Sequence, residues 1–183
     1  MSHRLFIAIR PPEDVRDRLV DAMEGIDGAR WVDEENLHLT LCFVGEVERP
    51  AANDLAAALA QISSPAVTLS VDGVGHFDKR NRHGARPRAL WARVPRYGLL
   101  EELRLKVERA CEMAGLGRET RRFTPHITLA RLGPDVGEIG TWLARFGDLS
   151  AGPWLATEFI LYESHLGQGG SFYEPVTAFA LRN

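Results

Sequence analysis

The chain contains the same ordered set of segments twice. In each copy an apolar strand precedes an amphipathic helix, and a second strand that carries a His-x-Thr pattern follows. These segments fall at 5–9, 11–24 and 37–44 in the first copy, and at 89–94, 99–114 and 126–130 in the second. His38 and His126 are 88 positions apart, and an internal repeat of this period predicts two similar lobes related by a pseudo-two-fold axis.

The match continues beyond each motif. A helix and a strand are predicted at 50–62 and 67–74, a second helix and strand at 137–146 and 154–162, and a last strand at 173–181. This order predicts an α+β fold that is bilobal, with two pseudo-symmetric lobes of mainly antiparallel sheet forming a central cleft and helices on the outer faces. At 183 residues the chain has the size of one domain, 1–183, with approximate repeat halves 1–85 and 86–183.

Each motif places a His and a Thr two residues apart. On a β-strand such residues point to the same face, so His38 lies beside Thr40, and His126 lies beside Thr128. An imidazole titrates near pH 6.5, so one His of a pair can accept a proton while the other donates one. Hydroxyl groups can donate hydrogen bonds to phosphate oxygens as negative charge builds up there. The two motifs together therefore predict metal-free acid–base chemistry at phosphorus.

The charge of the chain is uneven. Its net charge of −3 gives no global attraction to nucleic acid, yet residues 78–88 contain five Lys or Arg and one His. Gly84 and Pro87 favour a loop here. Two interpretations remain open: a solvated surface loop between the halves, or a flexible basic flap that contacts phosphates.

The cysteine usage and the N-terminus indicate the compartment. Cys42 and Cys111 form no Cys-x-x-Cys pair, so we expect reduced structural thiols in a cytoplasmic protein. Cys42 is expected to be a packed thiol, although strand alternation turns it to the side of Thr40. The apolar run at 5–9 is too short for a signal peptide or a membrane span, so no membrane association is expected.

The paired motifs resemble those of the 2H phosphoesterase superfamily, and within it the RNA 2′,3′-cyclic phosphodiesterases, also called LigT-like or 2′-5′ RNA ligase proteins. The likeness extends over most of the chain and includes 4–8, 30–32, 36–45, 86–91, 123–131, 163–166 and 169–173. It implies an enzyme without metal or cofactor that opens a 2′,3′-cyclic phosphate and leaves a 2′-phosphate. It also implies RNA 3′ ends or small cyclic nucleotides as partners, and we expect a monomer.

The resemblance also implies roles for single residues. His38 and His126 correspond to the catalytic pair, Thr40 and Thr128 to the phosphate-holding hydroxyls, and Arg131 to an anion ligand. The sequence does not decide which His is the base, but we expect His126 to activate water and His38 to protonate the leaving O3′.

Strand alternation and the family resemblance disagree about the side to which Arg131 points. Counting by twos from His126 leads to Ala130, so a regular strand turns Arg131 away from the motif face. A strand end or a β-bulge at Ala130 would remove the conflict. The alternative is a surface ion pair.

Several other residues are candidate RNA contacts. Phe77 and Tyr173 could stack on a base, and Arg122, like its neighbour Arg121, could line the path of the RNA or form a solvated turn. Trp31 could be a wall of the site or could pack in the core, whereas Phe43 is expected to pack in the core.

Three alternatives to this function remain. The same catalytic pair would serve a 2′-5′ ligase or phosphodiesterase, or a hydrolase of ADP-ribose cyclic phosphate. A non-catalytic module that binds RNA ends would use the cleft without turnover. A metal hydrolase could use the four remaining histidines.

Overall fold

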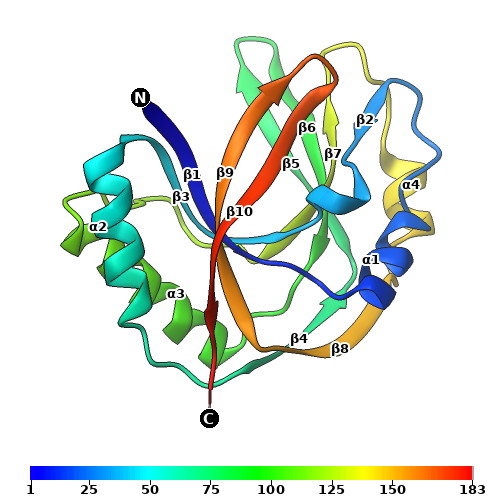
Figure 1. Cartoon of the computed structure of the whole chain (residues 1–183). Helices are drawn as coiled ribbons and strands as arrows, with labels where there is room; N and C mark the ends of the chain where they lie inside the picture. Colours follow the sequence, from blue (N-terminus) through cyan, green and yellow to red (C-terminus); the bar gives the residue numbers. More distant parts are fainter. Residues whose placement is uncertain (183) are drawn as a thin grey trace.

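The computed structural model describes residues 1–182 and forms an α+β fold with helices at both sides of a large sheet (Figure 1). The strands are β1 (Ser2–Ile9), β2 (Ala29–Trp31), β3 (Leu39–Glu48), β4 (Val67–Asp72), β5 (Val74–Asn81), β6 (Gly84–Arg93), β7 (His126–Leu132), β8 (Ser150–Ala156), β9 (Glu158–Gly167) and β10 (Gly170–Ala180). The helices are α1 (Glu13–Val20), the 3-10 turn η1 (Glu34–Asn36), α2 (Arg49–Ala60), α3 (Gly98–Met113) and α4 (Gly140–Arg145).

The main sheet joins the two lobes. Its strand order is β10-β9-β1-β3-β7-β6-β5, with β2 paired to β7, and every pairing is antiparallel. The central pair β3–β7 brings together the strands that carry the two motifs. A separate two-stranded sheet is formed by β4 and β8. The predicted α+β class with two similar halves and mainly antiparallel sheet is confirmed.

Each lobe is built from both halves of the sequence. Strand β9 from the second half pairs with β1 from the first, whereas β5 from the first half pairs with β6 from the second. The helices are exchanged in the same way. Helix α3 packs with α2 against β3, while α1 contacts β8 and lies next to α4 (Figure 1). Trp142 of α4 donates a hydrogen bond of 2.9 Å from Nε1 to the carbonyl oxygen of Ala22 after α1. This exchange makes the two halves depend on each other for their cores.

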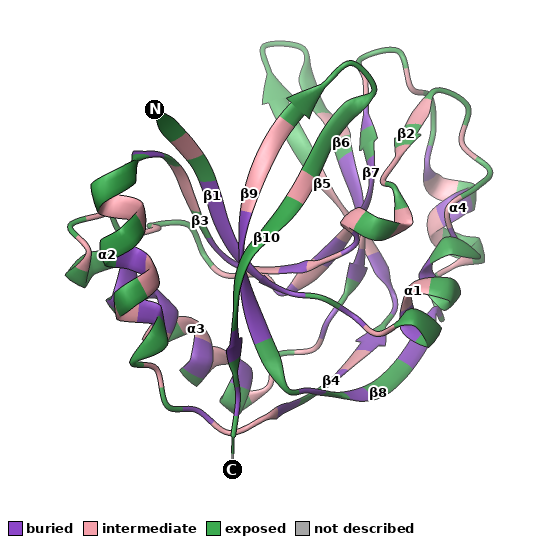
Figure 2. Ribbon diagram, viewed as in Figure 1, coloured by how far each residue is buried: buried purple, intermediate pink, exposed green. Residues whose placement is uncertain are grey.

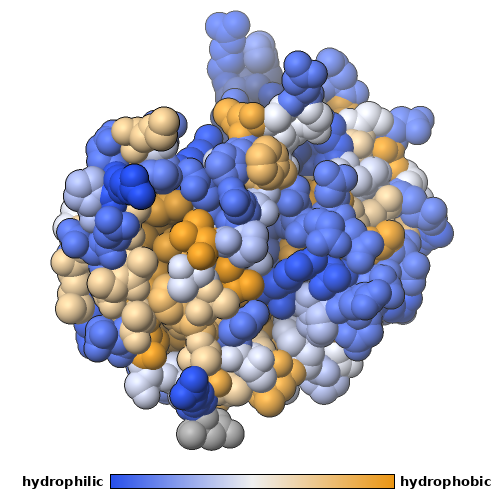
Figure 3. All heavy atoms as spheres, viewed as in Figure 1, coloured by the Kyte–Doolittle hydropathy of each residue, from blue (hydrophilic) through white to orange (hydrophobic). Residues whose placement is uncertain are grey.

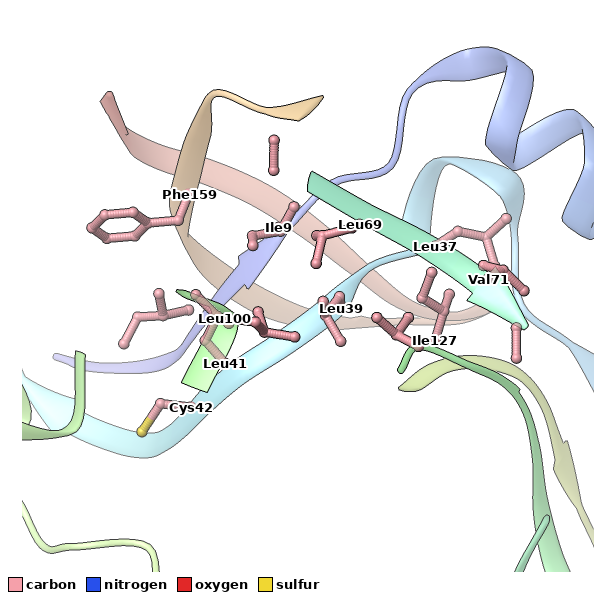
Figure 4. Close-up of a cluster of buried hydrophobic side chains, with 14 of the residues drawn as sticks. Ile9, Leu37, Leu39, Leu41, Cys42, Leu69, Val71, Leu100, Ile127 and Phe159 are labelled. Atoms are coloured by element: carbon pink, nitrogen blue, oxygen red, sulfur yellow. The ribbon is translucent and has the colours of Figure 1, made fainter. Parts of the chain in front are cut away.

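The core lies between the sheet and the helices. One face of β1, β3 and β7 contributes buried side chains to it, and Figure 2 shows buried stretches of these strands at the centre of the molecule. Figure 4 shows Leu39 and Ile127 among these side chains, and neither exposes any surface. Burying an aliphatic side chain of this size contributes about 1.5–3 kcal/mol to folding. The junction of the lobes is therefore held by hydrophobic packing.

Two predictions of local structure are wrong. Residues 78–88 do not form a flexible loop. Strands β5 and β6 pair along their length, from Val74 opposite Ala92 to Asn81 opposite Gly84, and carry the basic residues on a β-hairpin. Gly84, with a φ of 119°, takes a backbone conformation that other residues rarely adopt, and so allows the tight turn. The single strand predicted at 154–162 is two strands, β8 and β9, which belong to different sheets. None of the helices within residues 1–182 combines the length and the apolar character that a membrane span requires.

Candidate active site

The two motifs meet where β3 pairs with β7. Leu39 lies opposite Ile127 in this antiparallel pair, and both side chains point into the core. Residues that face each other across antiparallel strands share one face, and successive residues alternate between faces. The pairing therefore sets the His of each motif across from the Thr of the other, on the face turned away from the core. The resulting cross-strand pairs are His38 with Thr128 and Thr40 with His126.

Both imidazoles are held in the same way. His38 Nδ1 lies 2.6 Å from the carbonyl oxygen of Asn36, and His126 Nδ1 lies 2.6 Å from that of Thr124. A carbonyl oxygen only accepts hydrogen bonds, so Nδ1 carries the proton and donates it in both cases. Nε2 of each neutral ring is then the nitrogen with the free lone pair. Two copies of one backbone arrangement thus present two equivalent Nε2 atoms to the site.

Aromatic rings enclose each imidazole. Around His38, the ring centroids of Phe6 and Tyr173 lie at 4.9 and 5.1 Å. Around His126, those of Phe77 and Trp91 lie at 4.8 and 5.8 Å. Phe6 comes from β1, where it pairs with Phe43, and Trp91 comes from β6, where it pairs with Thr128, so each ring lies on the strand next to a motif strand. The structure places the predicted Phe77 and Tyr173 beside the catalytic candidates, where their rings hold the imidazoles in position.

The surroundings favour the neutral form of both histidines. Burial, followed by the nearby charges of His126 and Arg131, lowers the pKa of His38 to about 4 and outweighs the opposing hydrogen bond to Asn36. Burial and the charge of Arg88 lower the pKa of His126. Desolvation disfavours a cation, and neighbouring cations repel the added proton. Without an anion in the site, both rings are therefore neutral at pH 7.

A β-bulge decides the orientation of Arg131. Adjacent residues of β6 pair with Thr128 and Ala130 and leave Leu129 without a partner. The extra residue lets Leu129 and Ala130 both point into the core, and it reverses the alternation that follows. Arg131 is then exposed on the side of Thr128, where its charge reaches His38. The expected bulge is therefore present, at Leu129 rather than at the predicted Ala130.

The first motif has the same irregularity, and it corrects two expectations. Adjacent residues of β1 pair with Thr40 and Cys42 and leave Leu41 without a partner. Cys42 consequently points into the core, and its Sγ lies 3.8 Å from that of Cys111. Strict strand alternation predicts that Cys42 points to the same side as Thr40, and this prediction is wrong. The expected packed thiol is what the structure shows. Phe43 was expected in the core but is 58% exposed, on the motif face, at the position that Arg131 occupies in the other motif.

The remaining predicted contacts lie elsewhere or have other neighbours. Trp31 pairs with Ala130 and packs its ring 6.3 Å from that of Trp142, which favours the packing interpretation over a wall of the site. Arg122 is exposed on the segment before β7. It lines a cavity of about 510 Å³ among charged residues of α3 and that segment, and the two catalytic candidates are not part of this lining.

Sequence reasoning did not single out three residues that belong to the site. Phe6 and Trp91 lie on the strands that pair with the two motif strands but at different positions of the repeat, so the repeat does not point to them together. Arg88 gives no sequence signal either, since its place beside Phe77 depends on a bulge in β6 between Pro87 and Ala89. Within residues 1–182 there is no group of three His, Cys, Asp or Glu side chains arranged to hold a metal ion.

A duplicated α+β fold with one His-x-Thr motif from each half on a shared face defines a two-histidine phosphoesterase. The chain belongs to the LigT like phosphoesterase family, whose pattern matches residues 9–86 and 95–173. This confirms the resemblance seen in the sequence, and the chain is a phosphodiesterase.

Relatives and solved structures agree with this assignment. The RNA 2′,3′-cyclic phosphodiesterase of Escherichia coli K12 is 32% identical over 183 residues, covering 97% of this chain and 96% of the relative. The protein of the same name from Archaeoglobus fulgidus is 27% identical over 179 residues. The match covers 96% of this chain and 99% of the relative. A crystal structure of a phosphoesterase (TM-score 0.79, 27% identity) and one of E. coli LigT complexed with 3′-AMP (TM-score 0.78, 26% identity) each cover 100% of both chains.

Proposed function

We propose that this protein hydrolyses 2′,3′-cyclic phosphate ends of RNA to 2′-phosphomonoesters, without a metal or cofactor. The single observation that carries the proposal is the pairing of Leu39 with Ile127, which sets two complete His-x-Thr motifs on one face. The names of the relatives in E. coli and A. fulgidus support the substrate class. Because one chain supplies both motifs, the proposed site is complete in a monomer and in a single domain, 1–183. RNA ends as substrates agree with the cytoplasmic location expected from the sequence.

The proposed reaction is an in-line displacement at phosphorus. One neutral imidazole takes a proton from water through Nε2 as the water oxygen forms a bond to phosphorus. The bond from phosphorus to O3′ breaks, and the other imidazole, protonated, gives its proton to that oxygen. The hydroxyls of Thr40 and Thr128 donate hydrogen bonds to the non-bridging oxygens, and the charge of Arg131 offsets the negative charge that builds up there.

Substrate binding favours uptake from solvent of the proton that the reaction needs. In the free enzyme the pKa values of both histidines are lowered, so neither ring is a ready acid at pH 7. A bound phosphate diester brings a negative charge next to both imidazoles, which raises their pKa values again. The anionic substrate thus favours the singly protonated pair that acid–base catalysis requires.

The two histidines can be assigned to their roles by experiment. From the sequence we expect His126 as the base, whereas the deeper burial of His38 and its two cationic neighbours favour His38 as the neutral base. Replacing O3′ of the substrate by sulfur gives a leaving group that departs without a proton. The variant that lacks the acid should regain most of its rate on this substrate, and the variant that lacks the base should not.

The function itself is tested with a short RNA that ends in a 2′,3′-cyclic phosphate, incubated with the protein and EDTA. The expected product is a 2′-monophosphate, and His126→Asn should form it far more slowly. Loss of activity in EDTA would favour a metal hydrolase, and saturable binding without a product would favour a binding module. Turnover of ADP-ribose cyclic phosphate alone, or formation of 2′-5′ linkages alone, would replace the proposed activity with that alternative.

A further inference from the structure

The β5–β6 hairpin projects from the body of the protein beside the site (Figure 1). We call residues 78–88 of this hairpin the basic arm. It carries Lys79, Arg80, Arg82, Arg86 and Arg88 against a single acid, Asp78, in a chain whose net charge is −3. In Figure 3 the protruding top of the molecule over this hairpin is hydrophilic throughout. Such a concentration of positive charge on one projecting element is typical of a surface that binds anions.

The cations of the basic arm have no anionic partners in the folded chain. None of the five forms an ion pair with a carboxylate anywhere in residues 1–182, and Asp78 is paired with His76. Lys79 lies directly opposite Arg86 across the two strands. Like charges in this position are destabilising. In addition, Nε of Arg86 is shielded from solvent and has no hydrogen-bond partner. An anionic ligand would offset the repulsion between the two cations, whereas the shielded Nε is out of its reach.

The arm begins at the catalytic candidates. Phe77, the last residue before it in β5, contacts the His126 ring edge-on. Arg88, at its other end, lies 5.6 Å over the Phe77 ring, and its charge acts on His126. Lys79 follows Phe77 by two residues and so shares its face. From Phe77 to the turn at Asn81 the strand extends about 13 Å at roughly 3.3 Å per residue. The line of charge therefore leads outward from the site where the phosphate reacts.

The hairpin of the other lobe has a different chemistry. The β9–β10 hairpin lies at the opposite end of the main sheet from β5–β6 and contains no Lys or Arg. Near its turn, Phe172 is 54% exposed and stacks on the His165 ring with centroids 4.8 Å apart. Proteins that hold single-stranded RNA combine a cationic track for the backbone with exposed aromatic rings for the bases. One hairpin provides the first feature and the opposite hairpin the second.

We propose that the basic arm binds the backbone phosphates of the RNA strand on the 5′ side of the terminal cyclic phosphate. The protein then acts preferentially on the ends of oligonucleotides, and a cyclic mononucleotide, which lacks those phosphates, is a poorer substrate. This inference rests on the proposed function, because it identifies the substrate class of the same site. Lys79 and Arg86 on the face of Phe77 are its central contacts.

The test compares two substrates and three proteins. The substrates are a 2′,3′-cyclic mononucleotide and an RNA of about eight nucleotides that ends in the same cyclic nucleotide. The proteins are the wild type, Lys79→Thr/Arg86→Thr, and Arg49→Gln/Arg109→Gln. Threonine suits a β-strand, so the arm variant keeps the hairpin. The control removes two exposed arginines from α2 and α3, on the other side of the molecule, and so changes the net charge equally.

The measured quantity is the ratio of kcat/KM for the oligonucleotide to that for the mononucleotide, between 50 and 200 mM salt. Each phosphate contact contributes about 0.7 to the slope of log affinity against log salt for a single strand. Losing two contacts should lower the slope by about 1.4, so the advantage of the wild type over the arm variant should fall about sevenfold across this range. The control should behave like the wild type.

Equal ratios and equal slopes in the arm variant and the wild type would overturn the proposal. If the wild type turns over neither substrate, the proposed function itself fails, which is a different result. The wild type also allows a test without any substitution. Neutral methylphosphonate linkages in place of the upstream phosphates should abolish the preference for the oligonucleotide, and a preference that persists would refute a role for those phosphates.

Discussion

Replacing His38 by Asn should make the stability of the protein less sensitive to acid. The pKa of His38 is about 4 in the folded protein, against 6.5 for an exposed imidazole. Between these values the unfolded chain binds a proton that the folded protein does not, so stability falls as the pH falls. Through His38, the free energy of unfolding should be about 2 kcal/mol lower at pH 5 than at pH 7.5, since one pKa unit corresponds to about 1.36 kcal/mol.

The assay is urea unfolding at pH 7.5 and pH 5.0. Asn keeps a hydrogen-bond donor near the position of Nδ1, so the bond to the Asn36 carbonyl can persist while the titrating group is lost. The wild type should lose about 2 kcal/mol more stability between the two pH values than His38→Asn does. His83→Asn, at the exposed turn of the basic arm, serves as the control and should keep the dependence of the wild type.

An equal loss of stability in the wild type and in His38→Asn would refute the reasoning. It would mean that His38 binds its proton equally well in the folded and unfolded chains, and that burial by Phe6 and Tyr173 has no electrostatic effect. A second measurement examines the link to function. An NMR titration of the His38 ring should give a higher pKa when a nucleoside 2′-monophosphate is bound, because its phosphate places negative charge beside the imidazole.

Three further predictions concern the site and its support. His126→Asn should lower kcat for a 2′,3′-cyclic phosphate by about 10²–10⁴-fold, measured at saturating substrate, and a near-normal rate would exclude a shared acid–base site. Thr128→Val should lower kcat by up to about 10²–10³-fold with little change in the melting temperature, because it removes a donor to the developing charge and keeps the side-chain shape. Leu39→Ala should cost about 2–5 kcal/mol in a denaturation experiment, since Leu39 is fully buried at the junction of the lobes, and a cost below 1 kcal/mol would contradict that packing.

The site could be predicted from the sequence because it depends on short, repeated spacings. A His and a Thr two residues apart share a strand face wherever the strand is placed, and a second copy in the same context implies a related position in a second lobe. The same repeat pointed to the α+β architecture. The chain order of the strands and helices therefore held most of the information about the catalytic candidates.

The tertiary structure decided everything that depends on irregular pairing. Bulges at Leu41 and Leu129 reverse the alternation, bring Phe43 and Arg131 to the motif face, and turn Cys42 into the core. A bulge is defined by the residues of the partner strand, so the pattern of one strand alone cannot locate it.

The exchange of elements between the halves was equally beyond the sequence. The repeat shows that β5 follows the first motif, but only long-range pairing with β6 turns residues 78–88 into a basic arm next to His126. The sequence alone determined which groups are the catalytic candidates, because the candidates follow from residue type and local spacing. The fold decided what surrounds them, because burial and nearby charge are set by segments that are distant in the chain.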